Sequence, residues 1–251
     1  MLAHQKRRAG QQEVTAAASA VGAAAGERGS GGLFPLLELD RARASISSEL
    51  LGAITTLASI APTGLAEGGR LVLQWGEAER LESIATWLDD PSLVDPRISF
   101  WIGVAAGPIL EAAAAAAPGV GRHAWTGAAC PLCGGPSQVS VIAEESGEFM
   151  AGSPRSLVCS RCATWWAFAR AVCPFCAEQD SRRIEGFSAE AWPWVRVDCC
   201  QTCRAYVKTF DLRVPGARDI IPLVDDVATL TLDLWAIEHG YTRTTVSLAG
   251  V

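Results

Sequence analysis

All nine cysteines of the chain lie between Cys130 and Cys203, and eight of them form four C-x-x-C pairs. The pairs are Cys130 and Cys133, Cys159 and Cys162, Cys173 and Cys176, and Cys200 and Cys203. A C-x-x-C turn places two thiolates on one side of a tight loop, and two such turns supply the tetrahedral set of four sulfurs that zinc or iron prefers. The spacing therefore predicts two metal sites with these eight cysteines as ligands.

The cysteine region contains an internal repeat. The first pair maps onto the third by a shift of 43 residues, and the second pair maps onto the fourth by a shift of 41. Trp165 and Tyr206 follow the same rule, since each stands three positions after a second pair. The repeat favours ligand sets formed within each unit, so that the first two pairs hold one ion and the last two pairs hold the other. Interleaved pairing, as in cross-braced modules, is the alternative.

The ninth cysteine, Cys199, stands directly beside Cys200. Two adjacent cysteines do not ligate one ion comfortably, so Cys199 is either an inert thiol packed near Val197 or a redox-reactive thiol beside a metal site. We favour the inert interpretation.

Short β-branched or alternating stretches lie between the cysteine pairs, at 139–142, 156–158 and 195–197. They predict strands joined by a loop around 146–147 in the first unit and around 189–192 in the second. Each unit is then a metal-pinned β-hairpin of rubredoxin or zinc-ribbon type, too small to be stable without its ion.

Helical periodicity dominates the chain from Phe34 to about Ala117. Apolar residues share one face in two segments, which contain Leu50, Ile54, Leu57 and Ala61, and Leu81, Ile84 and Leu88. Breaks are expected at 62–64 and 91–92, and a third helix is expected to begin at Asp95 as N-cap, followed by a first-turn proline. A last helix, capped by Asp225 or Asp226, is expected to end near Gly240.

These patterns predict an α+β multidomain protein in which a helical N-terminal domain precedes two rubredoxin-like units and a C-terminal helix. The expected segments are a mobile tail at 1–32, the helical domain at 33–126, the metal units at 127–170 and 171–214, and the C-terminal helix and tail at 215–251.

Composition excludes several classes of protein. The net charge is −6, and residues 127–214 carry nine basic and nine acidic side chains, which disfavours a nucleic-acid ribbon. Because no secretory or twin-arginine signal is apparent, we interpret the cysteines as thiols in a reducing cytoplasm rather than as a disulfide framework. The apolar run from Ile98 to Leu110 is shorter than the roughly 18 residues that cross a bilayer, so no membrane span is predicted. The three histidines are scattered and a closed four-thiolate site offers no open position, so no catalytic residues are assigned.

The order of these motifs resembles the FdhE family, the accessory proteins of formate dehydrogenase assembly. The resemblance rests on Cys130-Pro-Leu-Cys133-Gly134, on the other three pairs, on Ala205-Tyr206-Val207-Lys208 after the last pair, and on the stretches Asp225 to Asp233 and Glu238 to Tyr241. It covers roughly half of the chain. Ala177 replaces the glycine expected after the third pair, Cys199 is additional, and the N-terminal domain is short.

The resemblance implies a cytoplasmic maturation factor, or chaperone, that is not an enzyme. It would bind the catalytic subunit of a molybdenum- or tungsten-dependent formate dehydrogenase and carry two iron ions in rubredoxin-type sites of four cysteines each, although zinc fits the same ligands. The candidates for the partner-binding surface are aromatic, although some of them are expected to lie in the core, where a ribbon of this size needs aromatic cover: Trp165, Trp166, Trp192, Trp194 and Tyr206. The alternatives are a rubredoxin-type electron-transfer protein and a zinc-ribbon module tied to nucleic acid or transcription, and self-association is left open.

Overall fold

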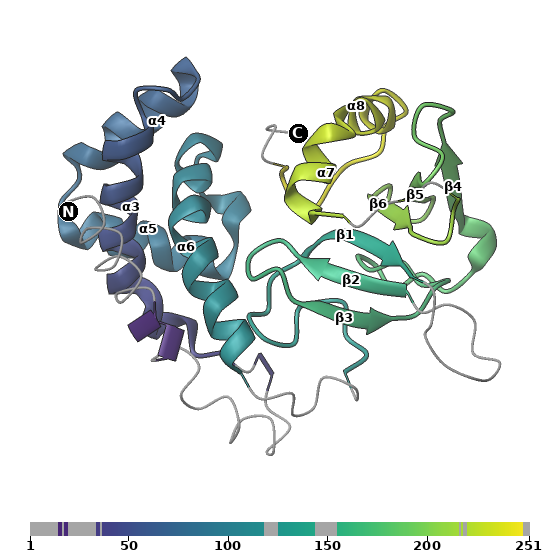
Figure 1. The fold of residues 1–251 in the computed structure, drawn as a ribbon, viewed down its shortest axis with the longest axis horizontal. Helices are drawn as coiled ribbons and strands as arrows, with labels where there is room; N and C mark the ends of the chain where they lie inside the picture. Colours follow the sequence, from purple (N-terminus) through teal and green to yellow (C-terminus); the bar gives the residue numbers. More distant parts are fainter. Residues whose placement is uncertain are drawn as a thin grey trace. The chain divides into compact units, whose positions relative to one another are not determined.

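The computed structural model describes residues 15, 16, 18, 19, 34, 35, 37–117, 125–143, 155–215, 217 and 220–247. The chain forms two compact units, Met1–Val120 and Gly121–Val251. The first is helical and the second contains a sheet with two helices, so the predicted α+β class is confirmed (Figure 1). Most of the tail predicted at 1–32 and the loop predicted at 146–147 lie outside the described residues.

The helical unit consists of η1 (Leu39–Ala42), α3 (Arg43–Leu57), α4 (Thr63–Gln74), α5 (Glu77–Asp89), η2 (Pro91–Leu93) and α6 (Pro96–Ala116). Its core contains Leu50 and Ile54 of α3 and Ile84 and Leu88 of α5, as the apolar periodicity predicted. Leu57, which was expected on the same face, is partly exposed at the end of α3. The predicted helices therefore exist, and each buries its predicted face in part.

One helical segment was expected between the breaks at 62–64 and 91–92, and the structure divides it into α4, whose sequence contains three glycines, and α5. Two of those glycines lie against α6. A Cβ on Gly68 would lie 2.7 Å from Cβ of Arg97, and one on Gly69 would lie 3.2 Å from Nε1 of Trp101. The indole N–H of Trp101 also donates to the carbonyl of Leu65 at 2.7 Å. The glycines therefore allow two helix backbones to approach closely and do not form a loop.

Helix α6 begins as predicted, because the carboxylate of Asp95 accepts a hydrogen bond from the backbone N–H of Arg97 and Pro96 occupies the first turn. It continues through Pro108 and the alanine run for 21 residues. By length and composition alone this helix could cross a membrane, and half of its most apolar window is buried in the structure. It packs against α3 and α4 (Figure 1). We interpret it as the core helix of the helical unit.

The second unit is built on one six-stranded sheet. Its strands are β1 (Ser137–Ile142), β2 (Arg155–Cys159), β3 (Trp165–Phe168), β4 (Ile184–Ser188), β5 (Val195–Cys200) and β6 (Tyr206–Asp211). The order is β3-β2-β1-β6-β5-β4, with antiparallel pairing inside each cysteine unit. A parallel pairing of β1 with β6, in which Ser140 faces Thr209, joins the two cysteine units. The repeat therefore produces two three-stranded halves of a single sheet (Figure 1).

Two short helices, α7 (Pro222–Ala228) and α8 (Leu230–Glu238), replace the single C-terminal helix that was expected. The N-cap of α7 is Ile221, and neither Asp225 nor Asp226 occupies that position. Instead, the carboxylate of Asp225 accepts from the backbone N–H of Ile221, and Asp226 is fully buried. The predicted end is confirmed, because Gly240 has a φ of +75° directly after His239.

The core of this unit lies between the sheet and α8. It joins Val139, Val141, Val197, Tyr206 and Phe210 of the strands to Leu232 and Ala236 of the helix. The chain after α8 returns to the sheet, where the backbone N–H of Tyr206 donates to the carbonyl of Thr242 and the N–H of Thr242 donates to the carbonyl of Arg204. The end of the chain is thereby attached to the turn that carries the fourth cysteine pair.

Candidate metal centres

The eight predicted ligands gather into two clusters, one in each half of the sheet. Site 1 contains Cys130, Cys133, Cys159 and Cys162, and site 2 contains Cys173, Cys176, Cys200 and Cys203. In each cluster the Sγ atoms all lie within 4.8 Å of one another. The structure thus groups the cysteines within each unit, as the repeat favoured, and not in the interleaved arrangement.

The sulfur spacing fits a tetrahedral ion. Four thiolates at a zinc–sulfur distance of about 2.3 Å would place their sulfurs about 3.8 Å apart. In site 1, Sγ of Cys130 lies 3.6 Å from that of Cys162, and Sγ of Cys133 lies 3.4 Å from that of Cys159. In site 2 the corresponding distances are 3.8 and 3.7 Å. Both clusters could hold a zinc or ferrous ion with small adjustments, and such an ion would fix the two turns of each unit together.

The same turn geometry recurs at all four C-x-x-C pairs. The residue after each second cysteine has a positive φ: Gly134 at 72°, Ala163 at 52°, Ala177 at 59° and Arg204 at 60°. The backbone N–H of each first cysteine donates to the carbonyl five residues later at 2.8 to 2.9 Å, in Gly135, Thr164, Glu178 and Ala205. Three of the four positive-φ positions are not glycine, although an L-residue in this region costs about 1 kcal/mol or more. The turns therefore hold the thiols in place at some conformational cost.

Backbone N–H groups also point at the sulfurs. The N–H of Arg161 lies 3.4 Å from Sγ of Cys159, and the N–H of Phe175 lies 3.4 Å from Sγ of Cys173. Such donors stabilise thiolates, which a divalent ion requires as ligands. In site 1, hydrogen bonds within the cluster, first from Cys130, lower the pKa of Cys162, while burial raises the pKa of Cys159. A bound ion must displace the protons that remain on the other thiols.

Site 1 is covered by protein. Its four cysteine side chains are at most 4% exposed. Arg161, in the second turn, is buried, and a Cβ on the neighbouring Gly135 would lie 2.9 Å from Cδ of Arg161 and 3.1 Å from Sγ of Cys159. The aliphatic stem of the arginine therefore passes over the backbone at Gly135, close to a ligand sulfur.

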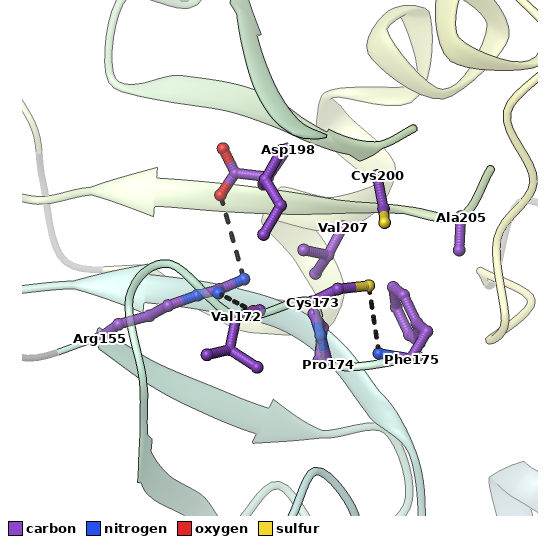
Figure 2. A pocket seen from close by; sticks show the side chains of 10 residues that line it. Arg155, Val172, Cys173, Pro174, Phe175, Asp198, Cys200, Ala205 and Val207 are labelled. Carbon is purple, nitrogen blue, oxygen red and sulfur yellow. Dashed lines mark hydrogen bonds and ion pairs between the residues drawn. The ribbon is translucent and has the colours of Figure 1, made fainter. Parts of the chain in front are cut away.

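Site 2 has one covered side and one open side. Cys173 and Cys200 are buried, whereas Cys176 is exposed and Cys203 is partly exposed. On the covered side lies a cavity of about 10 Å³, which is room for about one water molecule. Figure 2 shows Arg155 reaching from β2 toward Asp198 of β5 across this cavity, with Cys173 and Cys200 at the other end.

Arg155 connects the first half of the sheet to site 2. Its Nε donates to the hydroxyl of Ser140, and its Nη1 donates to the carbonyl of Val172, directly before Cys173, at 3.1 Å. Its Nη2 has no hydrogen-bond partner and lies 4.0 Å from Oδ2 of Asp198. The guanidinium therefore positions the chain that enters site 2 and supplies positive charge beside it.

Cys199 lies away from both clusters. Alternation along β5 directs its side chain into the core under α8, where it is fully buried beside Tyr206 and Ala236. Burial raises the pKa of its thiol to about 12. The inert interpretation is therefore the one that the structure supports.

The aromatic candidates for a partner surface divide into two groups. Trp166 and Tyr206 are buried, and the indole N–H of Trp166 donates to the carbonyl of Gly127. Trp192 and Trp194 are half-buried and contact each other edge to face. Only Trp165 of these five residues is exposed, at 42%. The surface role is thus wrong for the two buried residues, because Tyr206 packs in the core under α8 and Trp166 is 3% exposed.

The sequence analysis missed a buried ionic cluster between β6, the two C-terminal helices and Arg243. Nζ of Lys208 lies 2.8 Å from Oδ1 of Asp226 and 2.5 Å from Oδ2 of Asp233, and Arg243 contacts both carboxylates at 2.8 and 3.0 Å. Tyr206 donates its hydroxyl to Asp233 at 2.8 Å. The alternation of side chains along β6 could have indicated that Lys208 is buried, because Lys208 shares a strand face with Tyr206 and Phe210.

Comparisons with known proteins agree with this architecture. Residues 171–249 match the family model described as FdhE, C-terminal domain. The chain is 33% identical over 119 residues to a protein FdhE homolog of Aquifex aeolicus, and 32% identical over 123 residues to one of Pseudomonas aeruginosa. Each alignment covers 47% of this chain, but only 40% and 38% of the respective relatives.

The fold is also similar to that in the crystal structure of the FdhE protein from Pseudomonas aeruginosa. The TM-score is 0.68 at 22% sequence identity, covering 89% of this chain and 77% of that chain. At this identity the likeness supports the fold, while the domain model and the relatives support the family. The chain, with two four-cysteine clusters on one shared sheet, is therefore similar to the FdhE family, whose C-terminal domain model matches residues 171–249.

Proposed function

We propose that this protein is a cytoplasmic accessory factor for the maturation of a molybdenum- or tungsten-dependent formate dehydrogenase, and that it is not itself an enzyme. The similarity to the FdhE family carries the proposal. The two clusters support it, because four cysteine side chains around an ion fill a tetrahedral coordination shell and leave no position for a substrate.

In this proposal the eight clustered cysteines hold two ions, and iron is favoured over zinc by the family resemblance. Either ion would supply a structural cross-link between the two turns of its unit. Other residues of the protein compensate the charge of the sites and complete the core around them. Backbone N–H groups and the buried guanidinium of Arg155 offset thiolate charge, and α8 with the returning chain completes the sheet core.

The test of the accessory role is genetic. The gene is deleted in the source organism, and formate oxidation is measured in extracts together with the amount of mature dehydrogenase. We expect activity to be lost and to return with the wild-type gene but not with a variant that carries Cys133→Ser and Cys176→Ser together. Unchanged activity with fully matured enzyme in the deletion strain would refute the accessory role.

A rubredoxin-type electron-transfer role is the second candidate, because Cys176 is exposed and would bring an ion close to solvent. Metal analysis and an absorption spectrum of anaerobically purified protein separate the two. Electron transfer requires iron with a reversible potential and normal dehydrogenase maturation without this protein. Zinc at full occupancy would refute electron transfer and leave the accessory role standing.

A further inference from the structure

The two clusters share ligands and turn geometry, but they differ in access. Every cysteine of site 1 is buried, whereas one edge of site 2, formed by Cys176 and Cys203, reaches the surface. The residues inside the C-x-x-C turns differ in exposure in the same way. Leu132 and Arg161 are buried in the turns of site 1, and Thr202 is exposed in a turn of site 2.

Position by position, the repeat identifies what covers one site and not the other. Arg161 and Thr202 occupy equivalent places, each directly before the last cysteine of its site. Arg161 lies over Gly135 beside Sγ of Cys159. Thr202 instead donates its hydroxyl to the carboxylate of Glu178 at 2.5 Å, and the next arginine, Arg204, turns to the carbonyl of His239 and the ring of Tyr241. No side chain of these residues covers the Cys176 and Cys203 edge.

We propose that the two sites have different functions: site 2 exchanges a soft divalent ion with an outside acceptor through its Cys176 and Cys203 edge, and site 1 retains its ion and stabilises the sheet. The inference rests on the proposed metal sites. In the exchange, thiolate or nitrogen ligands of the acceptor would bond to the ion as the bonds to the two edge sulfurs break, and the bonds to Cys173 and Cys200 would then break as the ion leaves. The released thiolates take up protons from water, and the oxidation state of the ion does not change.

The difference in access should give the two sites different rates of metal release. An acceptor can approach Cys176 in the folded protein, whereas it can reach site 1 only after a local opening that exposes buried sulfur. Even about 1.4 kcal/mol of additional opening free energy would slow release about tenfold. The structure therefore predicts two well-separated phases of metal release from one folded chain.

The experiment uses full-length protein loaded with zinc and a chromophoric chelator in excess, with release followed by absorbance. We expect two equivalents in total, with one released at least about tenfold faster than the other. Iodoacetamide added at the end of the fast phase, followed by tryptic mass spectrometry, assigns the phase. The modified cysteines should be those of site 2.

A single substitution that leaves all eight cysteines in place tests the cause. Arg161→Thr gives site 1 the residue that site 2 has, and it should accelerate the slow phase toward the fast one while leaving the fast phase unchanged. Arg170→Thr, which removes the same charge from an exposed position of the same unit, is the matched control and should change neither phase.

The possible outcomes separate the two proposals. Two equivalents released at one rate, or alkylation of site 1 first, would overturn the division of function while the metal sites stand. An unchanged slow phase in Arg161→Thr would overturn the assignment of Arg161 as the cover. Fewer than two bound ions at full loading would overturn the proposed metal sites and this inference together.

Discussion

Replacing Lys208 by methionine should strongly destabilise the second unit. Lys208 and Arg243 balance the carboxylates of Asp226 and Asp233, and the four side chains are at most 5% exposed. Methionine keeps most of the apolar stem but removes the ammonium group. The two carboxylates would then face Arg243 alone, which leaves one buried negative charge without compensation.

Removing one partner from a buried ion pair costs about 3 to 5 kcal/mol, because the remaining charge stays desolvated. At about 1.4 kcal/mol per factor of ten, amide protection in α8 and β6 should fall by roughly two to three and a half orders of magnitude. Hydrogen exchange read by mass spectrometry measures this directly. Peptides from α3 to α6 should keep their protection and serve as the internal reference.

The double variant Lys208→Met with Asp233→Asn is the matched control. It removes one cation and one anion, and the asparagine still offers an oxygen to the hydroxyl of Tyr206. We expect it to recover at least half of the lost protection. A loss below about 1 kcal/mol in the single variant, or a double variant that is no better than the single one, would refute charge compensation as the reason that the cluster is stable.

Three further predictions concern single positions. Ala177→Gly should stabilise the second unit by about 0.5 to 1 kcal/mol, because Ala177 has a φ of 59°, and Ala177→Val should destabilise it; equal urea midpoints would contradict this. Asp95→Ala should cost the helical unit about 1 kcal/mol at pH 7 through the lost N-cap. A hydrogen bond from the side chain of Arg97 lowers the pKa of Asp95 below its usual 3.8, so the charged carboxylate of Asp95 stabilises the fold above that pH. Part of the difference in melting temperature between the wild type and Asp95→Ala should therefore vanish as the pH falls through the lowered pKa. Cys199, with a pKa of about 12, should stay unmodified by iodoacetamide at pH 8 in the folded protein, and mass spectrometry showing labelling at the rate of a free thiol would contradict its burial.

The parts of the fold that follow from local rules could be predicted from sequence. Cysteine spacing predicted the four paired turns, because a C-x-x-C turn is a local structure that its own backbone determines, and the internal repeat favoured the grouping of those turns within each unit. The strands β1 and β5 contain several β-branched residues, and α6 begins at an N-cap followed by proline. Each of these signals is contained within a few consecutive residues.

The parts that were missed depend on contacts between distant residues. The break between α4 and α5 was not predicted, and the close approach of Gly68 and Gly69 to Arg97 and Trp101 of α6 joins residues that are far apart in the sequence. Lys208 and Asp226 are residue types that are almost always exposed, and only their mutual pairing makes burial tolerable. The parallel pairing of β1 with β6 joins strands from two repeats, and no local pattern specifies that register. The five-segment division of the chain stays a prediction, although the shared sheet argues against two separable metal modules.

That shared sheet explains how one repeated motif can give two unlike sites. The turns are nearly identical, but each half of the sheet has a different neighbour. At site 2, Arg155 from the first half holds the chain just before Cys173, and the chain after α8 is hydrogen-bonded to Arg204 just after Cys203. These contacts secure site 2 at both ends of its sequence and leave its Cys176 edge open. The repeat therefore specifies the ligands, whereas the joining of the two halves decides which of those ligands solvent can reach.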